Sequence, residues 1–128
     1  MDAIRHKRLE DQLLSELATL ILSGEIKDPR VGPFVSLTRV EASSDLSAAK
    51  VFVSAFSVSP AEGAGETDEA QFARIDQAVE GLTRASGFIQ SQVARRIRLR
   101  LTPKLTFLPD RGIKEGFELT ERMKGLFQ

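Results

Sequence analysis

The stretch Arg84-Ala85-Ser86-Gly87-Phe88-Ile89 interrupts a long helical pattern, and the fold can be worked out from the residues on either side of it. Apolar residues before this stretch recur at helical spacing: Phe72, Ile75, Val79 and Leu82. The same spacing resumes after it with Ile89, Val93 and Ile97. Such spacing marks one face of an α-helix, and a glycine between two such runs favours a bend. The sequence therefore predicts two helices joined by a kink at residues 85–87.

The residues upstream of the kinked helix predict another helix and two strands. A helix that ends at Gly24 is indicated by the apolar stripe Leu9, Leu13, Leu17, Leu20 and Ile21. Residues 28–33 contain two prolines and predict a rigid loop. Residues 34–41 and 50–56 are rich in β-branched and aromatic side chains and flank a turn at 43–47. We therefore expect these two segments to pair as antiparallel strands.

The downstream residues complete the predicted fold. Residues 105–108 predict a short third strand, since Pro103 ends the preceding helix. Residues 57–68 predict a polar, flexible loop, and residues 113–128 predict a short C-terminal helix. Helices that connect the second and third strands would cover one face of the sheet. The order α-β-β-α-kink-α-β predicts a single α+β domain over residues 1–128, with a three-stranded sheet packed on helices.

The composition excludes several classes of functional site. The chain has 128 residues, no Cys and one His, so disulfides, thiolate zinc sites and cysteine nucleophiles are excluded. No apolar run approaches the roughly 20 residues that span a bilayer. Residues 1–8 lack the apolar stretch of a secretion signal. We therefore expect a cytoplasmic protein.

Charge is distributed unevenly, although the formal net charge is zero. Residues 60–80 contain six acidic residues and one Arg, a net charge of −5. Residues 81–104 contain six basic residues and no acid, a net charge of +6. Three interpretations remain open. The two segments pair with each other, they face solvent separately, or the basic segment binds an anionic partner.

The order of elements resembles that of a type II KH domain, an RNA-binding fold. The usual KH clamp is a Gly-x-x-Gly loop between two helices, but no two of the nine glycines stand three positions apart. Ala85-Ser86-Gly87 instead resembles the Ala-x-Gly kink of the ribosome-binding factor A family. Further stretches resemble that family in order along residues 5–120: Asp28-Pro29-Arg30-Val31, Leu37-Thr38-Arg39-Val40-Glu41, Asp45-Leu46-Ser47, Ala49-Lys50-Val51, Leu99-Arg100 and Pro103-x-Leu105-x-Phe107.

The resemblance implies a KH-like bacterial assembly factor of the small ribosomal subunit. Such a protein would bind the free 30S subunit, contact 16S rRNA and assist its late maturation without catalysis. A protein without a catalytic group shifts an RNA folding equilibrium only by binding one state more tightly. We therefore expect a monomer that needs no metal, cofactor or membrane.

Binding to RNA requires cations that converge on closely spaced phosphates, and Arg suits this role because it pairs bidentately with phosphate. The main candidates lie along and beyond the kinked helix: Arg84, Arg95, Arg96, Arg98, Arg100 and Lys104. Auxiliary candidates are Arg5, Lys7 and Arg8 near the N-terminus, and Arg39 and Lys50 on adjacent strands. The alternative for the auxiliary residues is an ordinary solvated surface. We expect replacement of Arg95, Arg96 and Arg98 by Glu to preserve the fold and abolish binding.

Other residues have competing interpretations. Gly87 either lets a phosphate approach the backbone, with or without a positive φ, or serves only the packing of the kink. His6 lacks a neighbouring nucleophile or carboxylate that would make it a catalytic base, and Arg30 is expected to tie its loop to Asp28 or a carbonyl group. Five phenylalanines are interpreted as core, so no base-stacking platform is expected: Phe52, Phe56, Phe72, Phe88 and Phe107.

Two other functions remain open. A protein-interaction module would dock its basic helix on an acidic protein, and excess rRNA would leave that binding unchanged. An enzyme would need a metal at the acidic residues near the end of the chain, Asp110, Glu115, Glu118 and Glu121. The last three follow the spacing of a helix surface and need no such role, so we expect no catalysis.

Overall fold

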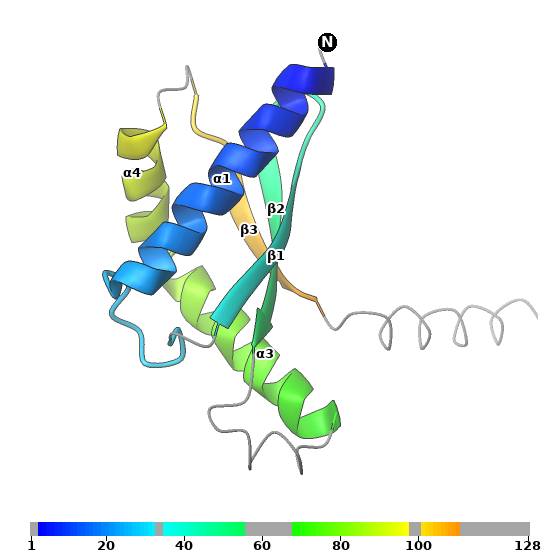
Figure 1. The fold of residues 1–128 in the computed structure, drawn as a ribbon. Helices are drawn as coiled ribbons and strands as arrows, with labels where there is room; N and C mark the ends of the chain where they lie inside the picture. Colours follow the sequence, from blue (N-terminus) through cyan, green and yellow to red (C-terminus); the bar gives the residue numbers. More distant parts are fainter. Residues whose placement is uncertain (1–2, 33–34, 56–67, 98–100, 111–128) are drawn as a thin grey trace, which may run out of the picture.

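The computed structural model describes residues 3–32, 35–55, 68–97 and 101–110. In chain order it contains α1 (Ala3–Ser23), β1 (Val35–Ala42), β2 (Ala48–Ala55), α3 (Asp68–Arg84), α4 (Ser86–Arg96) and β3 (Lys104–Pro109) (Figure 1). This order confirms the predicted α+β class and KH-like sequence of elements. The predicted loop at 57–68, except its last residue, and the predicted helix at 113–128 lie outside the described residues.

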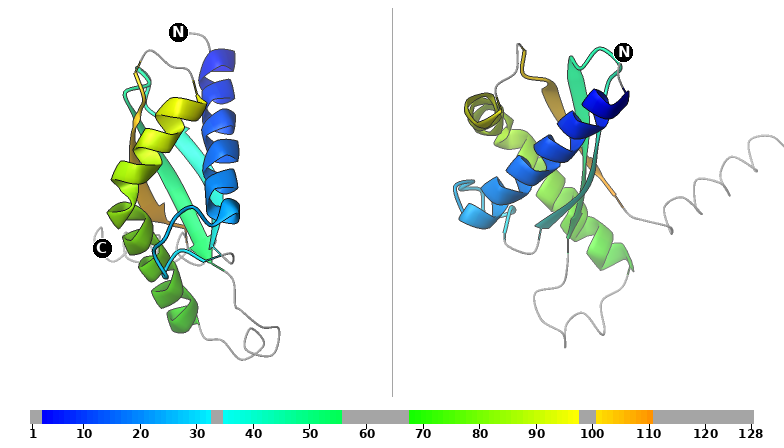
Figure 2. Two further views of the ribbon diagram at one scale, coloured as in Figure 1. Left: turned by 90° about the vertical axis from the view of Figure 1, so that its left-hand side faces the viewer. Right: turned by 45° about the horizontal axis from the view of Figure 1, so that its top comes forward.

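The three strands form one mixed sheet in the order β1-β2-β3. β1 and β2 pair antiparallel. After β2 the chain passes through α3 and α4 and then forms β3, which pairs parallel to β2. The helices lie on one side of the sheet (Figure 2), as the crossover predicts. No described helix packs on the other side, which we call the open sheet face.

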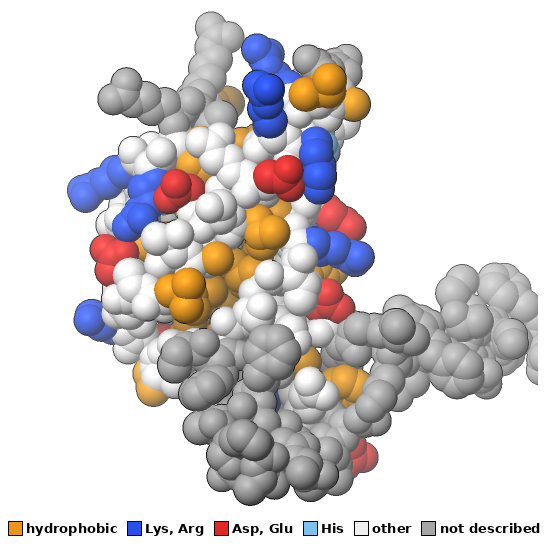
Figure 3. All heavy atoms as spheres, in the orientation of Figure 1, with side chains coloured by type: hydrophobic (Ala, Val, Ile, Leu, Met, Phe, Trp, Pro, Cys, Tyr) orange, Lys and Arg blue, Asp and Glu red, His pale blue; other side chains and the backbone are white. Residues whose placement is uncertain are grey.

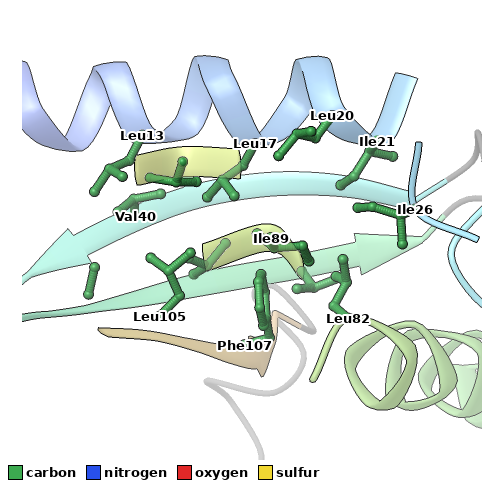
Figure 4. Close-up of a cluster of buried hydrophobic side chains, with 14 of the residues drawn as sticks. Leu13, Leu17, Leu20, Ile21, Ile26, Val40, Leu82, Ile89, Leu105 and Phe107 are labelled. Carbon is green, nitrogen blue, oxygen red and sulfur yellow. The ribbon is translucent and has the colours of Figure 1, made fainter. Parts of the chain in front are cut away.

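A single core fills the space between the helices and the sheet (Figure 4). Val51, Val53 and Ala55 of β2 point toward the helices and are buried, as strand alternation predicts. The predicted stripe of α1 is buried over its whole length, from Leu9 to Ile21. Gly24 follows α1 with a φ of 76°, so its lack of a side chain lets the chain leave the helix without strain.

The strand ends differ from the predicted ranges for local reasons. β2 begins at Ala48, because Ser43 N–H donates to the Ala48 carbonyl oxygen (2.8 Å) and Ala48 N–H donates to Ser43 Oγ (3.1 Å). β3 extends to Pro109. The Lys104 amide donates to the Ser47 carbonyl oxygen, just before β2, and the Asp110 amide donates to that of Val53 in β2. The backbone nitrogens of the odd-numbered residues between them therefore point to the free edge, where a proline is tolerated.

The expectation that the phenylalanines form core is wrong in part. Phe107 is buried, but Phe52 points to the open sheet face and Phe88 is 41% exposed. Phe88 precedes the fully buried Ile89 by one residue, which is about 100° around the helix, so the two cannot share the inner face. Phe56 lies outside the described residues.

The turn between β1 and β2 is fixed by one carboxylate. Asp45 Oδ1 accepts hydrogen bonds from Ser43 Oγ, Ser47 Oγ and Ser47 N–H at 2.7–3.1 Å. The hydroxyl of Ser47, then that of Ser43, lowers the pKa of Asp45 to about 2. These bonds hold Leu46 at a φ of 61°, a conformation that a leucine adopts only under constraint.

Candidate nucleic-acid interface

The kink is a bend in a nearly continuous helix. Ala85 has a φ of −86° and a ψ of 5°, between the end of α3 and the start of α4. Its N–H donates to the Gly81 carbonyl oxygen (3.1 Å), and its own carbonyl accepts from Ile89 N–H (2.9 Å). These two bonds tie Ala85 to the last turn of α3 and to the first turn of α4. The kink predicted at residues 85–87 is confirmed.

Gly87 lies in the first turn of α4, where the chain itself does not require a glycine. Its φ is not positive, so of the alternatives left open for Gly87 a left-handed conformation is excluded. A Cβ atom built on Gly87 would meet no atom within 4 Å, so close packing does not explain the glycine either. The residue is exposed, and the space above it is open to another molecule.

Arg96 is tied to α1 and the loop that follows it. Its guanidinium lies 3.6 Å from the Glu16 carboxylate and 3.0 Å from that of Glu25. The Arg96 side chain retains 30% of its exposure, so it is a partly accessible link between α4 and α1. No local pattern in the sequence indicates this pairing, because the partners lie about 70 to 80 residues away.

Arg84 and Arg95 of the kinked helix form no ion pair with a described residue, although Arg84 lies close enough to Asp28 for its charge to help lower the pKa of that carboxyl group. Both are exposed, and neither has a carboxylate oxygen within 4.0 Å among those residues. Arg98 and Arg100 lie outside the described residues. Figure 3 shows the cations over α4 as a group separate from those over the start of α1. We call Arg84, Gly87 and Arg95 the basic kink surface.

The N-terminal cluster divides into free and engaged residues. Arg5 and Arg8 are exposed and form no ion pair with a described residue, whereas Lys7 pairs with Asp11 (3.2 Å). The expectation that His6 has no neighbouring carboxylate is wrong, because the Glu10 carboxylate lies 3.6 Å from its Nδ1. His6 is nevertheless structural: its Nε2–H donates to the carbonyl oxygens of Ala42 (2.8 Å) and Ser43 (3.1 Å). The Glu10 carboxylate accepts a hydrogen bond from the Ala42 N–H (2.8 Å), so α1 holds the end of β1 through one donor and one acceptor.

Lys104 belongs with the strand cations rather than with α4. It stands on the open sheet face, because the next residue, Leu105, is buried toward the helices. Lys50 and Arg39 share that face. The structure therefore places the described sequence candidates in three groups, one along the kinked helix, one at the start of α1 and one across the open sheet face.

The loop after α1 packs on α3 through a glycine. Arg30 Nε and Nη2 donate to the two carboxylate oxygens of Asp28, at 2.9 and 2.6 Å, and Nη1 lies 3.1 Å from Glu80. This confirms the structural role expected of Arg30. A Cβ on Gly81 would lie 2.9 Å from Val31 Cγ2 and 3.1 Å from Arg30 Cβ. Gly81 is thus the glycine that packing requires, a role that the sequence did not indicate.

The substitution Asp28→Asn is expected to flatten the acid side of the stability curve. The side-chain hydrogen bond from Arg30 lowers the pKa of Asp28 from 3.8 to about 2. A carboxyl group with a depressed pKa stabilises the fold above its unfolded pKa, and this contribution disappears as the pH falls from 3.8 toward 2. The variant should therefore be less stable than the parent near neutral pH, and this difference should narrow in that interval. Urea unfolding as a function of pH measures it, and a difference independent of pH would contradict the linkage.

The described part of the chain offers neither a metal site nor a membrane span. Within it, no three His, Asp or Glu side chains gather closely enough to hold a metal ion. Asp110 accepts a hydrogen bond from the Thr38 hydroxyl, and Glu115, Glu118 and Glu121 lie outside the described residues. Among the described helices, none combines the length and apolar character needed to cross a bilayer.

Comparisons with known proteins agree with this architecture. The family model described as ribosome-binding factor A matches residues 5–123. Ribosome-binding factor A of Treponema denticola is 40% identical over 126 residues, which cover 98% of this chain and 86% of that protein. The crystal structure of ribosome-binding factor A from Thermus thermophilus superposes with a TM-score of 0.61 at 32% identity, covering 81% of this chain and 93% of that one.

A second similar structure is described together with a ribosomal particle. It is a homology model of Thermus thermophilus ribosome binding factor A, fitted into the cryo-electron-microscopy map of its 30S complex. Its TM-score is 0.55 at 31% identity, covering 80% of this chain and 92% of that one. The family match over nearly the whole sequence, the relatives at about 40% identity and the shared fold together show that this chain belongs to the ribosome-binding factor A family.

Proposed function

We propose that the protein binds the free 30S ribosomal subunit by contacting 16S rRNA with its basic kink surface, and that it assists late maturation of that rRNA. Membership of the ribosome-binding factor A family and the 30S complex of a similar protein support the choice of partner. The open space at Gly87, flanked by the exposed cations Arg84 and Arg95, supports the choice of surface.

Gly87 is the observation that carries the proposal. A glycine inside a helix destabilises it by about 0.5–1 kcal/mol relative to alanine. Neither φ nor packing within the described chain accounts for it. A phosphate or ribose that approaches the backbone of α4 would need the space that a Cβ occupies, and the positive end of the helix would favour an anion there.

The remaining basic residues form auxiliary contacts in this proposal. Arg5 and Arg8 extend from the first turns of α1, whereas Lys7 and Arg96 already have carboxylate partners and contribute less. Arg39, Lys50 and Lys104 lie on the open sheet face, apart from this surface.

The proposed mechanism requires no cofactor and no catalysis. A protein that binds one rRNA conformation tenfold more tightly than another shifts their equilibrium by about 1.4 kcal/mol. Residues 1–128 would act in the cytoplasm as one KH-like domain and as a monomer. Release would follow when the rRNA reaches a conformation that no longer fits the kinked helix.

Gly87→Ala should separate binding from folding. The added Cβ meets no atom of the described chain and raises helix propensity, so the free energy of unfolding should stay the same or rise by up to about 1 kcal/mol. Binding to 30S subunits should weaken, because the methyl group occupies the approach to the backbone. Co-sedimentation of the tagged protein and urea unfolding measure the two effects. A variant that binds 30S subunits as tightly as the parent would contradict the role of Gly87.

Sedimentation with separated 30S, 50S and 70S particles at two salt concentrations tests the proposed partner itself. We expect association with 30S subunits that weakens as salt rises, because phosphate contacts release counterions. Excess rRNA should compete for the protein. Binding that excess rRNA leaves unchanged would favour the alternative, a module that docks on an acidic protein.

A further inference from the structure

The open sheet face carries a second group of cations beside an aromatic ring. Strand register places its side chains in rows, with Arg39 opposite Phe52 and Phe52 beside Leu108. The next row contains Glu41, Lys50 and Thr106, and the row after it contains Ala48 and Lys104. No described helix covers these rows, so the face is available to a partner.

The cations of this face are available for phosphate. Lys50 and Lys104 are exposed, and among the described residues neither has a carboxylate oxygen within 4.0 Å. They lie on adjacent strands two positions out of register, so strand geometry puts their Cα atoms about 8 Å apart. Arg39 pairs with Glu41 at 3.4 Å, but both side chains are more than half exposed and solvent screens such a pair.

Arg39 and Phe52 form a stacking platform. The Arg39 guanidinium carbon lies 4.2 Å from the centroid of the Phe52 ring, and the Arg39 side chain is 58% exposed. A guanidinium whose inner face rests on a ring is held flat, and its outer face can stack on a nucleobase. The expectation that the chain lacks such a platform assumed that Phe52 belongs to the core, and the structure places this ring on the opposite face.

A hollow of about 560 Å³ lies beside this platform, within the size range of small-molecule sites. Its lining includes Glu41, Ala48 and Lys50 of the open sheet face, and Ala42, whose side chain packs toward the core. Thr106 supplies a hydroxyl group to the lining, whereas the Ser43 hydroxyl already bonds Asp45 and the Ala48 amide. The small side chain of Ala48 leaves room for a planar group, and the Thr106 hydroxyl can donate or accept a hydrogen bond.

We propose that the open sheet face binds a segment of single-stranded RNA. One base stacks on Arg39 above Phe52, a neighbouring base enters the hollow, and the connecting phosphates contact Lys50 and Lys104. The inference rests on the proposed function for its class of partner, RNA, but on different residues and a different face. Stacking and charge select single strands without strong sequence preference, because every base has a π-face.

Fluorescence anisotropy of the full chain with a short labelled single-stranded RNA tests this surface. The double substitution Lys50→Gln with Lys104→Gln should weaken binding about tenfold and lower the slope of log affinity against log salt by about 1.4, since each phosphate contact on a single strand contributes about 0.7. Lys27→Gln is the matched control, because Lys27 is exposed and has no ion pair with a described residue, but lies in the loop after α1. It should bind like the parent.

Arg39→Lys tests stacking apart from charge. The variant keeps the positive charge but loses the planar group, so it should bind the RNA about fivefold or more weakly and bind inorganic polyphosphate unchanged. Equal affinity of the parent and the sheet variants for the RNA would overturn the inference. Equal competition by duplex RNA would also overturn it.

These results are separable from the proposed function. If the parent protein fails to sediment with 30S subunits but the sheet variants lose RNA binding, the results support this surface and contradict the proposed function. If the parent sediments with 30S subunits but the sheet variants still bind the RNA, the results support the proposed function and contradict this surface.

Discussion

Replacing Arg84 and Arg95 together by Glu should abolish co-sedimentation with 30S subunits and leave thermal unfolding nearly unchanged. Both side chains are exposed and lack an ion-pair partner among the described residues. The attraction of Arg84 to Asp28 is the smallest of the causes that lower the pKa of that carboxyl group, so the substitutions remove little from the folded chain. On rRNA, each Arg would form charge-assisted hydrogen bonds worth about 1.5–3 kcal/mol. Losing both contacts weakens binding by on the order of a hundredfold or more, and the new carboxylates add repulsion.

Ala73→Glu provides the control for this double substitution. Ala73 is exposed on α3 and lies about 16 Å from Arg84 along the helix, so a carboxylate there should reduce binding only slightly. A folded Arg84→Glu/Arg95→Glu variant that binds as tightly as Ala73→Glu would show that another surface contacts the subunit.

Arg96 is left out of this experiment because of its contacts with α1. The sequence grouped it with Arg95 and Arg98 as a residue whose reversal leaves the fold intact. A Glu at position 96 would instead stand beside the carboxylates of Glu16 and Glu25, where the guanidinium now lies. Loss of binding by the triple variant would therefore mix lost RNA contacts with weakened packing between α1 and α4.

Ile89→Ala should produce the largest loss of stability at the kink, about 2–5 kcal/mol. Ile89 is fully buried and packs in the core between α4 and the sheet (Figure 4). Truncation removes buried apolar surface and leaves a cavity. Because Ile89 anchors α4 directly after the kink, the variant should also bind 30S subunits more weakly at temperatures where α4 is loosened. Urea unfolding measures the first effect.

Phe88→Ala is the adjacent control. Phe88 is 41% exposed, so its truncation should cost less than about 1 kcal/mol despite the larger side chain. If Phe88→Ala destabilised the protein as much as Ile89→Ala, the assignment of Ile89 to the buried face of α4 and of Phe88 to its exposed face would be wrong.

Periodicity predicted the fold well because the core follows it. The apolar stripes of α1 and α4 and the alternation of β2 are buried faces of the structure. In the predicted stripe of α3, Ile75 and Leu82 are buried, whereas Phe72 and Val79 are only partly buried. The kink at Ala85 was predictable because Gly87 and a break in the stripe coincide there.

Long-range contacts and surface grouping were not predictable from one sequence. Arg96 pairs with Glu25 across 71 positions, and no local pattern announces such a partner. Lys104 was grouped with the helix because it follows α4 closely, but strand alternation turns it to the open sheet face. Phe52 was assigned to the core because it is aromatic, and its place beside Arg39 depends on a register that only the paired strands define.

Tethered hydroxyl-radical cleavage tests the central claim most directly, since the chain has no native Cys to interfere. Ser91→Cys carries an iron chelate on the exposed side of α4, and Glu69→Cys carries it at the start of α3, about 22 Å from Arg84 along the helix. In complexes with 30S subunits we expect strong 16S rRNA cleavage from position 91 and little from position 69. Strong cleavage from position 69 with none from position 91 would contradict the account.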